Sequence, residues 1–286
     1  MDLTSPKTIK SIQNQFGFTF KKGLGQNFLT SHDVLDEIVT AAEIDGGVVE
    51  VGPGFGVLTR ELSEAADKVV SIELDERLLE VLNYTLSDCG NVKIVNGDVL
   101  KLDLKKLLEE EFPNQKVSFA ANLPYYITTP IITRLLEARL PIKNIVVMVQ
   151  KEVAMRLQAK PATKDYGAIT LLCKYYTEPE LITVVPAGLF VPPPKVDSAV
   201  LKLRVLDKPR VTVKNEKIFF RVIKAAFSQR RKTLLNCLVS GFDFTKAELA
   251  VILQSAGIDG TRRGETLSIE EFAELSDKIT ERTEEK

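Results

Sequence analysis

The sequence has little histidine, and this shortage excludes several kinds of chemistry. His32 is the single histidine in 286 residues, so a histidine-rich metal site cannot form and a zinc site is not expected. A Ser-His-Asp triad would have to use His32, but no nucleophile-elbow motif accompanies it. The residues before it, Leu29-Thr30-Ser31, instead predict a helix that begins here with Ser31 as its N-cap. We therefore expect no metal and a structural place for His32.

Cysteines and long apolar runs are also scarce. The three cysteines, Cys89, Cys173 and Cys237, are far apart and form no CxxC pair, which is typical of a reducing compartment. No stretch approaches the roughly 18 uncharged apolar residues of a membrane span. The first ten residues, MDLTSPKTIK, lack the apolar core of a secretory signal. We expect a cytoplasmic protein that makes no membrane contact.

Charge is balanced over the chain but unevenly placed. The formal net charge is -1, from 38 basic and 39 acidic residues. Lys21-Lys22 and the stretch from Lys195 to Lys232 are basic, whereas the tail from Glu270 to Glu285 is mostly acidic. A protein of this kind can bind RNA through local basic patches, although its overall charge would not attract RNA.

Short apolar runs alternate with helical patterns between Gly47 and Leu206. Strands are expected at 48–51, 69–74, 92–95, 117–121 and 145–149, and helices at 58–66, 76–86, 104–111, 131–138 and 151–158. Short, wholly apolar strands that alternate with helices predict a parallel sheet covered on both faces. Residues 182–185 and 199–205 are expected to add a closing antiparallel pair. The predicted fold class is α/β, a doubly wound, Rossmann-like sheet.

The strand signal fades after Leu206. Helical periodicity predicts helices at 217–238, 246–255 and 268–280, the last with a capping box formed by Ser268 and Glu271. We expect a catalytic domain over 1–206, with an N-terminal extension at 1–30. A small α-helical domain over 207–286 is expected to bind RNA.

A glycine-rich loop, Glu50-Val51-Gly52-Pro53-Gly54-Phe55-Gly56, follows the first expected strand. Glycines here, Gly52 and Gly54 above all, let the backbone approach a ligand at the switch point of the sheet. The spacing is GxGxG, whereas a dinucleotide site requires GxGxxG. This spacing disfavours an NAD-dependent oxidoreductase, and Glu50 suits a cationic methionyl group better than a pyrophosphate.

Two further acids end the next two expected strands. Glu73 is placed to accept both hydroxyls of a ribose, and Asp98 is placed to accept from the amino group of an adenine. With the glycine loop they predict a site for S-adenosylmethionine.

The fourth expected strand runs directly into Asn122-Leu123-Pro124-Tyr125. An exocyclic adenine amine is a poor nucleophile because its lone pair is delocalised into the ring. The amide oxygen of Asn122 and the main-chain oxygen of Pro124 could each accept one N–H of the amine and so orient its lone pair. Tyr125 would supply an aromatic face for stacking. The alternative is an ordinary turn, for which Asn and Pro are common.

Five motifs in this order resemble the KsgA family of ribosomal RNA adenine dimethylases along nearly the whole chain. They are GQNFL (25–29), the glycine loop, NLPYYITTP (122–130), FVPPPKVDS (190–198) and FSQRRKTL (227–234). The resemblance implies that Asn27 and Leu29 line the cofactor pocket, together with Gly52, Glu73, Asp98 and Asn122. It implies that Phe190 forms a second aromatic wall of the adenine pocket, opposite Tyr125. It also implies dimethylation of N6 on two adjacent adenines in a hairpin loop near the 3′ end of small-subunit rRNA.

Basic residues on the expected helix at 217–238 suggest where RNA binds. Lys217, Arg221, Lys224 and Arg231 fall near one face, and Arg230 lies beside it. Few acids interrupt this face, which favours phosphate contact over an ordinary solvated surface. Lys195 and Lys21-Lys22 could extend the surface.

Two rival functions stay open. One is a large-subunit adenine methylase of the macrolide-resistance type, which would share fold and chemistry; Pro130 and the triple proline before Lys195 favour the ribosome-assembly branch instead. The other is a non-catalytic assembly or RNA-binding factor, which the intact NLPY motif disfavours. The expected partner is small-subunit rRNA or a partly assembled small subunit. A monomer is expected, because no pattern of a dimerising helix is present.

Overall fold

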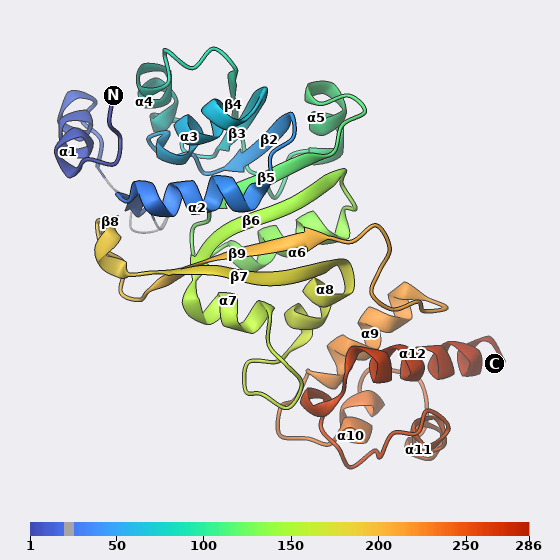
Figure 1. The fold of residues 1–286 in the computed structure, drawn as a ribbon. Coiled ribbons are helices and arrows are strands. Elements are labelled where there is room, and N and C mark those ends of the chain that lie inside the picture. Colours follow the sequence, from blue (N-terminus) through green and yellow to red (C-terminus); the bar gives the residue numbers. More distant parts are fainter. Residues whose placement is uncertain (20–25, 286) are drawn as a thin grey trace. The chain divides into compact units, whose positions relative to one another are not determined.

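The computed structural model describes residues 1–19 and 26–285 (Figure 1). Lys21, Lys22 and Gly25, which the sequence analysis singled out, lie outside the described residues. The chain forms two compact units. The first contains Met1–Ala154 and Glu178–Val205, and the second contains Met155–Thr177 and the chain from Leu206 onward. The second unit therefore includes a segment that lies before the expected boundary at 206/207, because α8 (Ala168–Tyr176) contacts two C-terminal helices.

A seven-stranded sheet forms the centre of the first unit. Its strands are β2 (Gly47–Val51), β3 (Lys68–Glu73), β4 (Val92–Asn96), β5 (Val117–Asn122), β6 (Ile142–Gln150), β7 (Thr177–Val185) and β9 (Ser198–Val205). Their order is β4-β3-β2-β5-β6-β9-β7. The first five are parallel, and β9 runs antiparallel to β6. All five residues of β2 are buried, as expected of a central parallel strand. The predicted α/β sheet is confirmed.

Strand order fixes where a ligand can bind. From β2 the chain moves outward through β3 to β4, and then returns to the other side of β2 with β5 and β6. Neighbouring connections therefore diverge at the carboxyl ends of β2 and β5, which leaves a crevice there. The sequence had placed both the glycine loop and the NLPY motif directly after these two strands.

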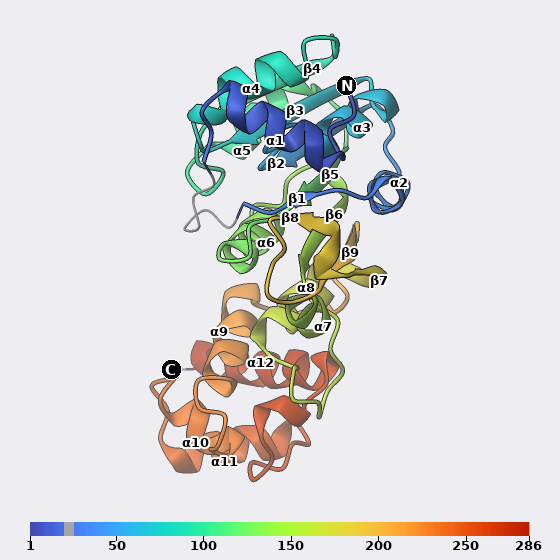
Figure 2. The ribbon, with the colours of Figure 1, turned by 90° about the vertical axis from the view of Figure 1, so that its left-hand side faces the viewer.

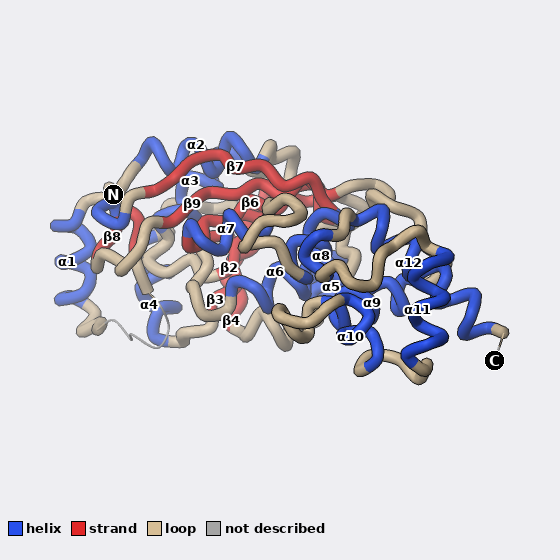
Figure 3. The backbone as a smooth tube through the Cα atoms, turned by 90° about the horizontal axis from the view of Figure 1, so that it is seen from below, coloured by secondary structure: helices blue, strands red, loops and turns tan. Residues whose placement is uncertain are grey.

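Helices lie on both sides of the strands (Figure 3). Those of the first unit are α1 (Pro6–Gln15), α2 (His32–Ala42), α3 (Val57–Ala65), α4 (Arg77–Thr85), α5 (Leu104–Glu111) and α6 (Thr128–Glu137). Helix α7 (Lys151–Leu157) begins in the first unit and ends in the second. Helix α2 contacts β5 and β6, and α3 contacts β3. Helix α2 begins at His32 with Ser31 as N-cap residue, as expected, although the Ser31 side chain makes no capping hydrogen bond.

Three elements of the first unit had no clear sequence signal. Helix α1 lies beside α4 (Figures 1 and 2), where Phe16 and Tyr84 pack with their ring centroids 5.5 Å apart. The strands β1 (Phe28–Leu29) and β8 (Phe190–Val191) pair antiparallel with each other. Two-residue strands are too short to show periodicity, so only the folded chain reveals this pairing.

The second unit is helical. It contains α8, α9 (Glu216–Ala226), α10 (Leu234–Val239), α11 (Lys246–Ser255) and α12 (Ile269–Glu284). Helix α11 has the predicted bounds, and α12 begins with the predicted capping box of Ser268 and Glu271. No helix in the described part of the chain is long and apolar enough to cross a membrane.

The single helix predicted over 217–238 is wrong. The chain leaves the helix after Ala226 and starts another at Leu234. The main-chain N–H of Leu234 donates to the main-chain oxygen of Arg262, and that of Leu235 donates to the main-chain oxygen of Gly260. In one continuous helix these N–H groups would instead donate to the main-chain oxygens four residues earlier. Apolar residues at 222, 226, 234 and 238 suit one helix or two, which is why periodicity alone failed. Thr233, the N-cap residue of α10, was the missed signal.

Candidate active site

A cavity opens at the carboxyl ends of the parallel strands of the first unit. It collects all seven residues that the sequence analysis assigned to the cofactor, and two of the three further catalytic candidates. The lining includes Asn27, Leu29, Gly52, Gly54, Glu73, Asp98, Asn122, Pro124 and Tyr125. These residues come from five separate segments of the chain, and the sheet topology brings them together.

The glycine loop turns sharply at the cavity wall. Gly52 and Gly54 have φ of 73° and 60°, a left-handed conformation that side chains disfavour. A Cβ atom added to Gly54 would lie 2.7 Å from Cε1 of Phe28. Phe28 in turn stacks on Phe55, with ring centroids 4.3 Å apart. Glycine is therefore required at 54 both by backbone conformation and by the N-terminal segment that packs on the loop.

Glu73 ends β3 and is only 5% exposed. Its Oε1 accepts the main-chain N–H of Asp75 at 2.7 Å, and its Oε2 accepts that of Gly54 at 3.4 Å. Burial raises the pKa of Glu73 above its usual range, whereas these two bonds act in the opposite direction. The carboxylate is thus fixed by backbone donors on two loops at the cavity wall.

Asp98 follows β4 and is less enclosed. Its Oδ1 accepts the main-chain N–H of Leu100 at 3.0 Å, and its Oδ2 lies 3.5 Å from Nζ of Lys101. The Asp98 side chain is 28% exposed and the Lys101 side chain 84% exposed, so this pair contributes little to stability. The hydrogen bond to Leu100 holds the carboxylate at the rim, where it can accept from a ligand.

Glu50, expected to face a cationic methionyl group, is 1% exposed. Its Oε2 accepts the hydroxyls of Thr59 and Ser71 at 2.6 and 2.7 Å. Burial raises the pKa of Glu50 to about 7, and the neighbouring Glu73 acts in the same direction. Glu50 thus remains partly protonated near neutral pH, which charge counting from the sequence could not show.

Asn122 ends β5 and contacts the N-terminal segment directly. Its Nδ2 donates to the main-chain oxygen of Asn27 at 3.1 Å. The amide nitrogen is thereby turned toward Asn27, and Oδ1 is the atom left to accept a hydrogen bond from a ligand.

Pro124 and Tyr125 follow on the same loop. The main-chain oxygen of Pro124 accepts the N–H of Ile127 and the hydroxyl of Thr128, each at 3.2 Å. A ligand amine would therefore have to replace the Thr128 hydroxyl at this oxygen, because a carbonyl has two lone pairs. The phenolic oxygen of Tyr125 lies 2.6 Å from Oγ of Ser198, and burial raises the pKa of Tyr125.

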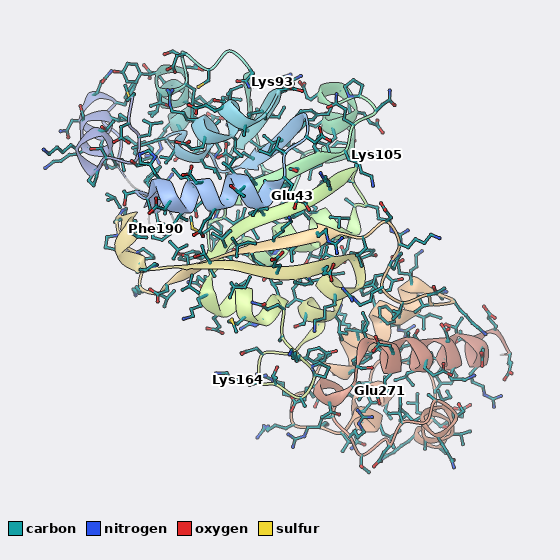
Figure 4. The ribbon with its side chains drawn as sticks, in the orientation of Figure 1. Glu43, Lys93, Lys105, Lys164, Phe190 and Glu271 are labelled. Atoms are coloured by element: carbon teal, nitrogen blue, oxygen red, sulfur yellow. The ribbon has the colours of Figure 1, made fainter. Side chains whose placement is uncertain are left out.

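Phe190 is the one catalytic candidate that does not line this cavity. It lies on β8 (Figure 4), opposite Leu29 of β1, and is 3% exposed. The described lining of the cavity does not include Phe190. Phe190 belongs to the same buried hydrophobic cluster as Leu29, and of these two paired residues Leu29 lines the cavity.

The predicted RNA-binding residues all belong to the second unit and have exposed side chains. Lys217, Arg221 and Lys224 share the exposed side of α9, as predicted. Arg230 and Arg231 do not continue this face, because both lie in the turn between α9 and α10. The expected common face for Arg231 is thus a further error of the single-helix prediction.

Two of these arginines have partners within the second unit. Nε of Arg221 donates to the main-chain oxygen of Gly241 at 2.8 Å, and the guanidinium group lies 4.5 Å from the ring centroid of Phe242. Arg230 donates to the main-chain oxygen of Lys164, which is labelled in Figure 4. Arg221 therefore links α9 to the chain at Gly241 and Phe242, in addition to any contact with RNA.

Sequence reasoning missed Ser198 and Thr128, whose hydroxyls contact the catalytic loop. Both belong to quoted motifs, but neither residue type signals a role until the fold brings its partner close. Tyr126, also missed, lines the cavity with 51% of its surface exposed. A second tyrosine directly after NLPY was the available signal.

Known proteins are similar to this chain along nearly its whole length. Ribosomal RNA small subunit methyltransferase A of Bacillus pumilus is 52% identical over 284 residues, which covers 97% of both chains. Its counterpart in Alkaliphilus oremlandii is 47% identical over 283 residues, which covers 98% of this chain and 99% of the relative.

Two solved structures share the fold. A dimethyladenosine transferase from Plasmodium falciparum has a TM-score of 0.73 at 28% identity and covers 90% of this chain and 98% of its own. The 23S rRNA methyltransferase ErmE has a TM-score of 0.67 at 29% identity, with coverage of 88% and 99%. The profile of the family described as "Ribosomal RNA adenine dimethylase" matches residues 17–280. With its glycine loop, strand-end acids and NLPY motif around one cavity, the chain belongs to the ribosomal RNA adenine dimethylase family.

Proposed function

We propose that this protein transfers methyl groups from S-adenosylmethionine to N6 of two adjacent adenines in small-subunit rRNA. The target is the hairpin loop near the 3′ end that the family resemblance implies, and the product is dimethyladenosine at both positions. One observation carries the proposal. Asn122 and Tyr125, which suit an adenine base, line the same cavity as Glu73 and Asp98, which suit a nucleoside cofactor.

The residues present fit S-adenosylmethionine. The backbone-fixed carboxylate of Glu73 can accept ribose hydroxyls, and Asp98 at the rim can accept an adenine amino group. Gly52 and Gly54 leave room for the amino-acid end of the cofactor, and Asn27 and Leu29 cover it from the N-terminal side. When bound, the cofactor supplies a methyl group activated by its positive sulfonium. No metal takes part in this proposal.

The catalytic loop orients the amine. Oδ1 of Asn122 accepts one N–H, and the main-chain oxygen of Pro124 accepts the other as the Thr128 hydroxyl turns away. The lone pair of N6 is then directed into the cavity, and the two acceptors favour the positive charge that develops on nitrogen. Tyr125 stacks on the base. A separate general base is not needed, because the methylated nitrogen is acidic enough to lose its proton to water.

The second unit supplies RNA contact in this proposal. Lys217, Lys224 and Arg231 present exposed cations to phosphates, with Arg221 and Arg230 beside them. Bases in a loop are partly unstacked already, which lowers the cost of placing one in a pocket. We propose that the partner is small-subunit rRNA or a partly assembled small subunit, bound by a monomer of this protein.

Methyl transfer to separated ribosomal subunits tests the proposal. Unmethylated small and large subunits are incubated in parallel with labelled S-adenosylmethionine, and the modified nucleoside is identified. We expect dimethyladenosine in the small subunit alone. Label in the large subunit would assign the chain to the resistance-type activity. The chain is also similar in structure to the 23S rRNA methyltransferase ErmE. Cofactor binding without transfer to either subunit would indicate a non-catalytic assembly factor.

A further inference from the structure

The phenolic oxygen of Tyr125 lies 2.6 Å from Oγ of Ser198, which is more than seventy residues away in sequence. Ser198 belongs to β9. Ser198 is 0% exposed. Tyr125 lines the cavity and is half-buried. The contact thus joins a ring at the cavity wall to a hydroxyl wholly inside the protein, and none of the roles assigned so far uses that hydroxyl.

The hydroxyl of Ser198 is held by a rigid frame. Ser198 is the first residue of β9 and pairs with Gln150 of β6 within the seven-stranded sheet. The residue before it, Asp197, accepts the main-chain N–H of Lys151 at 3.0 Å with its main-chain oxygen, and that of Ala187 at 3.1 Å with its carboxylate. A hydroxyl fixed in this way has little freedom to follow a moving ring.

A hydrogen bond at the phenolic oxygen restrains a tyrosine in a specific way. This oxygen lies on the axis about which the ring flips, so the bond does not stop ring flips. It does fix the direction of that axis, and with it χ1 of Tyr125. Without the bond, the half-buried side chain could swing toward solvent and would have to be ordered again whenever a base enters.

We propose that Ser198 is a positioning residue that holds the ring of Tyr125 at the cavity wall, ready to stack on the target adenine. The inference rests on the proposed stacking role of Tyr125. Ordering one free side chain on binding costs a factor of roughly three to ten. The rate of methyl transfer within the bound complex should therefore fall by that factor when the bond is removed. Cofactor affinity and the KM for RNA, which depend on other residues, should change little.

A double-mutant cycle tests this pairing. Ser198→Ala and Tyr125→Phe each remove the same bond and keep the aromatic face. Each should slow single-turnover methyl transfer to small subunits by roughly three- to tenfold, and the double variant should be no slower than either single variant. If the factor by which the double variant is slowed equals the product of the two single-variant factors, the two residues act separately. An unchanged rate in Ser198→Ala would overturn the proposal.

Ser118→Ala is the matched control for stability. Ser118 is also a buried strand serine, on β5 and 2% exposed. Its hydroxyl donates to the main-chain oxygen of Ala42 at 2.7 Å. Both serine variants should lower the melting temperature similarly, but only Ser198→Ala should slow transfer. Equal slowing in both would mean that general destabilisation, not ring position, explains the result.

Three-bond couplings of Tyr125 provide a readout that does not need activity. In the free protein they should report one χ1 rotamer, and in Ser198→Ala they should average over more than one. Averaged couplings already in the wild type would overturn the positioning role. If the wild type methylates neither subunit, the proposed function fails, while these couplings still decide whether Ser198 fixes the ring.

Discussion

Nδ2 of Asn122 donates to the main-chain oxygen of Asn27 across a distance of 3.1 Å, which joins the catalytic loop to the segment that covers the cofactor side of the cavity. The bond assigns a direction to the Asn122 amide, since its nitrogen is engaged and its oxygen is the atom left to accept a hydrogen bond. A backbone acceptor cannot be lost by mutation of Asn27, so the orientation depends on Asn122 alone.

Asn122→Ala should separate catalysis from cofactor binding. Loss of the acceptor oxygen should lower kcat by about 10²-fold or more, by analogy with other preorganised hydrogen-bonding groups. The dissociation constant of S-adenosylmethionine, measured by calorimetry, should change by only a few fold, because the ribose and adenine contacts remain. A variant that retains the wild-type turnover would remove Asn122 from the amine-orienting role.

Glu73→Gln should instead weaken binding of the cofactor. The glutamine oxygen can keep one backbone donor, but the charge that strengthens bonds to ribose hydroxyls is lost. We expect the dissociation constant to rise by about tenfold to a hundredfold, since hydrogen bonds to charged groups contribute about 1.5–3 kcal/mol. Glu80→Gln, the same change at an exposed position of α4, is the control. Equal affinities in the two variants would exclude Glu73 from the ribose site.

Glu50 should make stability depend on pH. Its folded pKa of about 7 is above the usual value of 4.5, so the folded state holds a proton that the unfolded state releases. The contribution of Glu50 to stability is complete below pH 4.5 and is lost as pH rises through 7, by about 3 kcal/mol in all. Glu50→Gln resembles the protonated form and still offers an oxygen to Thr59 and Ser71.

Urea unfolding at several pH values checks this expectation. The free energy of unfolding of Glu50→Gln relative to wild type should increase between pH 5 and pH 8. Parallel profiles of the two proteins over this range would mean that Glu50 keeps an ordinary pKa in the folded state.

Lys224→Ala and Arg221→Ala should differ in their effect on stability, although both residues lie on the exposed side of α9. Lys224→Ala should leave the melting temperature unchanged, weaken binding to rRNA and reduce its logarithmic salt dependence by about 0.7–0.9. Arg221→Ala should also lower the free energy of unfolding by about 1 kcal/mol, because it loses the bond to Gly241 and the stacking on Phe242. Filter binding across a salt series, with thermal melts of both variants, measures the difference. Unchanged salt dependence in Lys224→Ala would make this face ordinary solvated surface.

The cofactor half of the site could be predicted from the sequence because each part is local. A glycine loop after a buried strand, an acid at the end of the next strand, and NLPY after another all depend on short motifs beside apolar runs. Parallel strands then bring their carboxyl ends to one edge of the sheet without further information. The same locality explains why most strands and helices of the first unit were predicted within a few residues of their bounds.

Contacts between distant segments were decided by tertiary structure. The β1–β8 pairing, which places Phe190 opposite Leu29, and the bond between Ser198 and Tyr125 have no local signal. The raised pKa of Glu50 depends on burial, and the end of α9 depends on where α10 finds its packing partners. The sequence by itself determined the family, the sheet and the residue types of the site, because those depend on periodicity and motif. The tertiary structure alone decided which side chains are anchored, buried or free, because burial and hydrogen bonding depend on neighbours that only folding brings together.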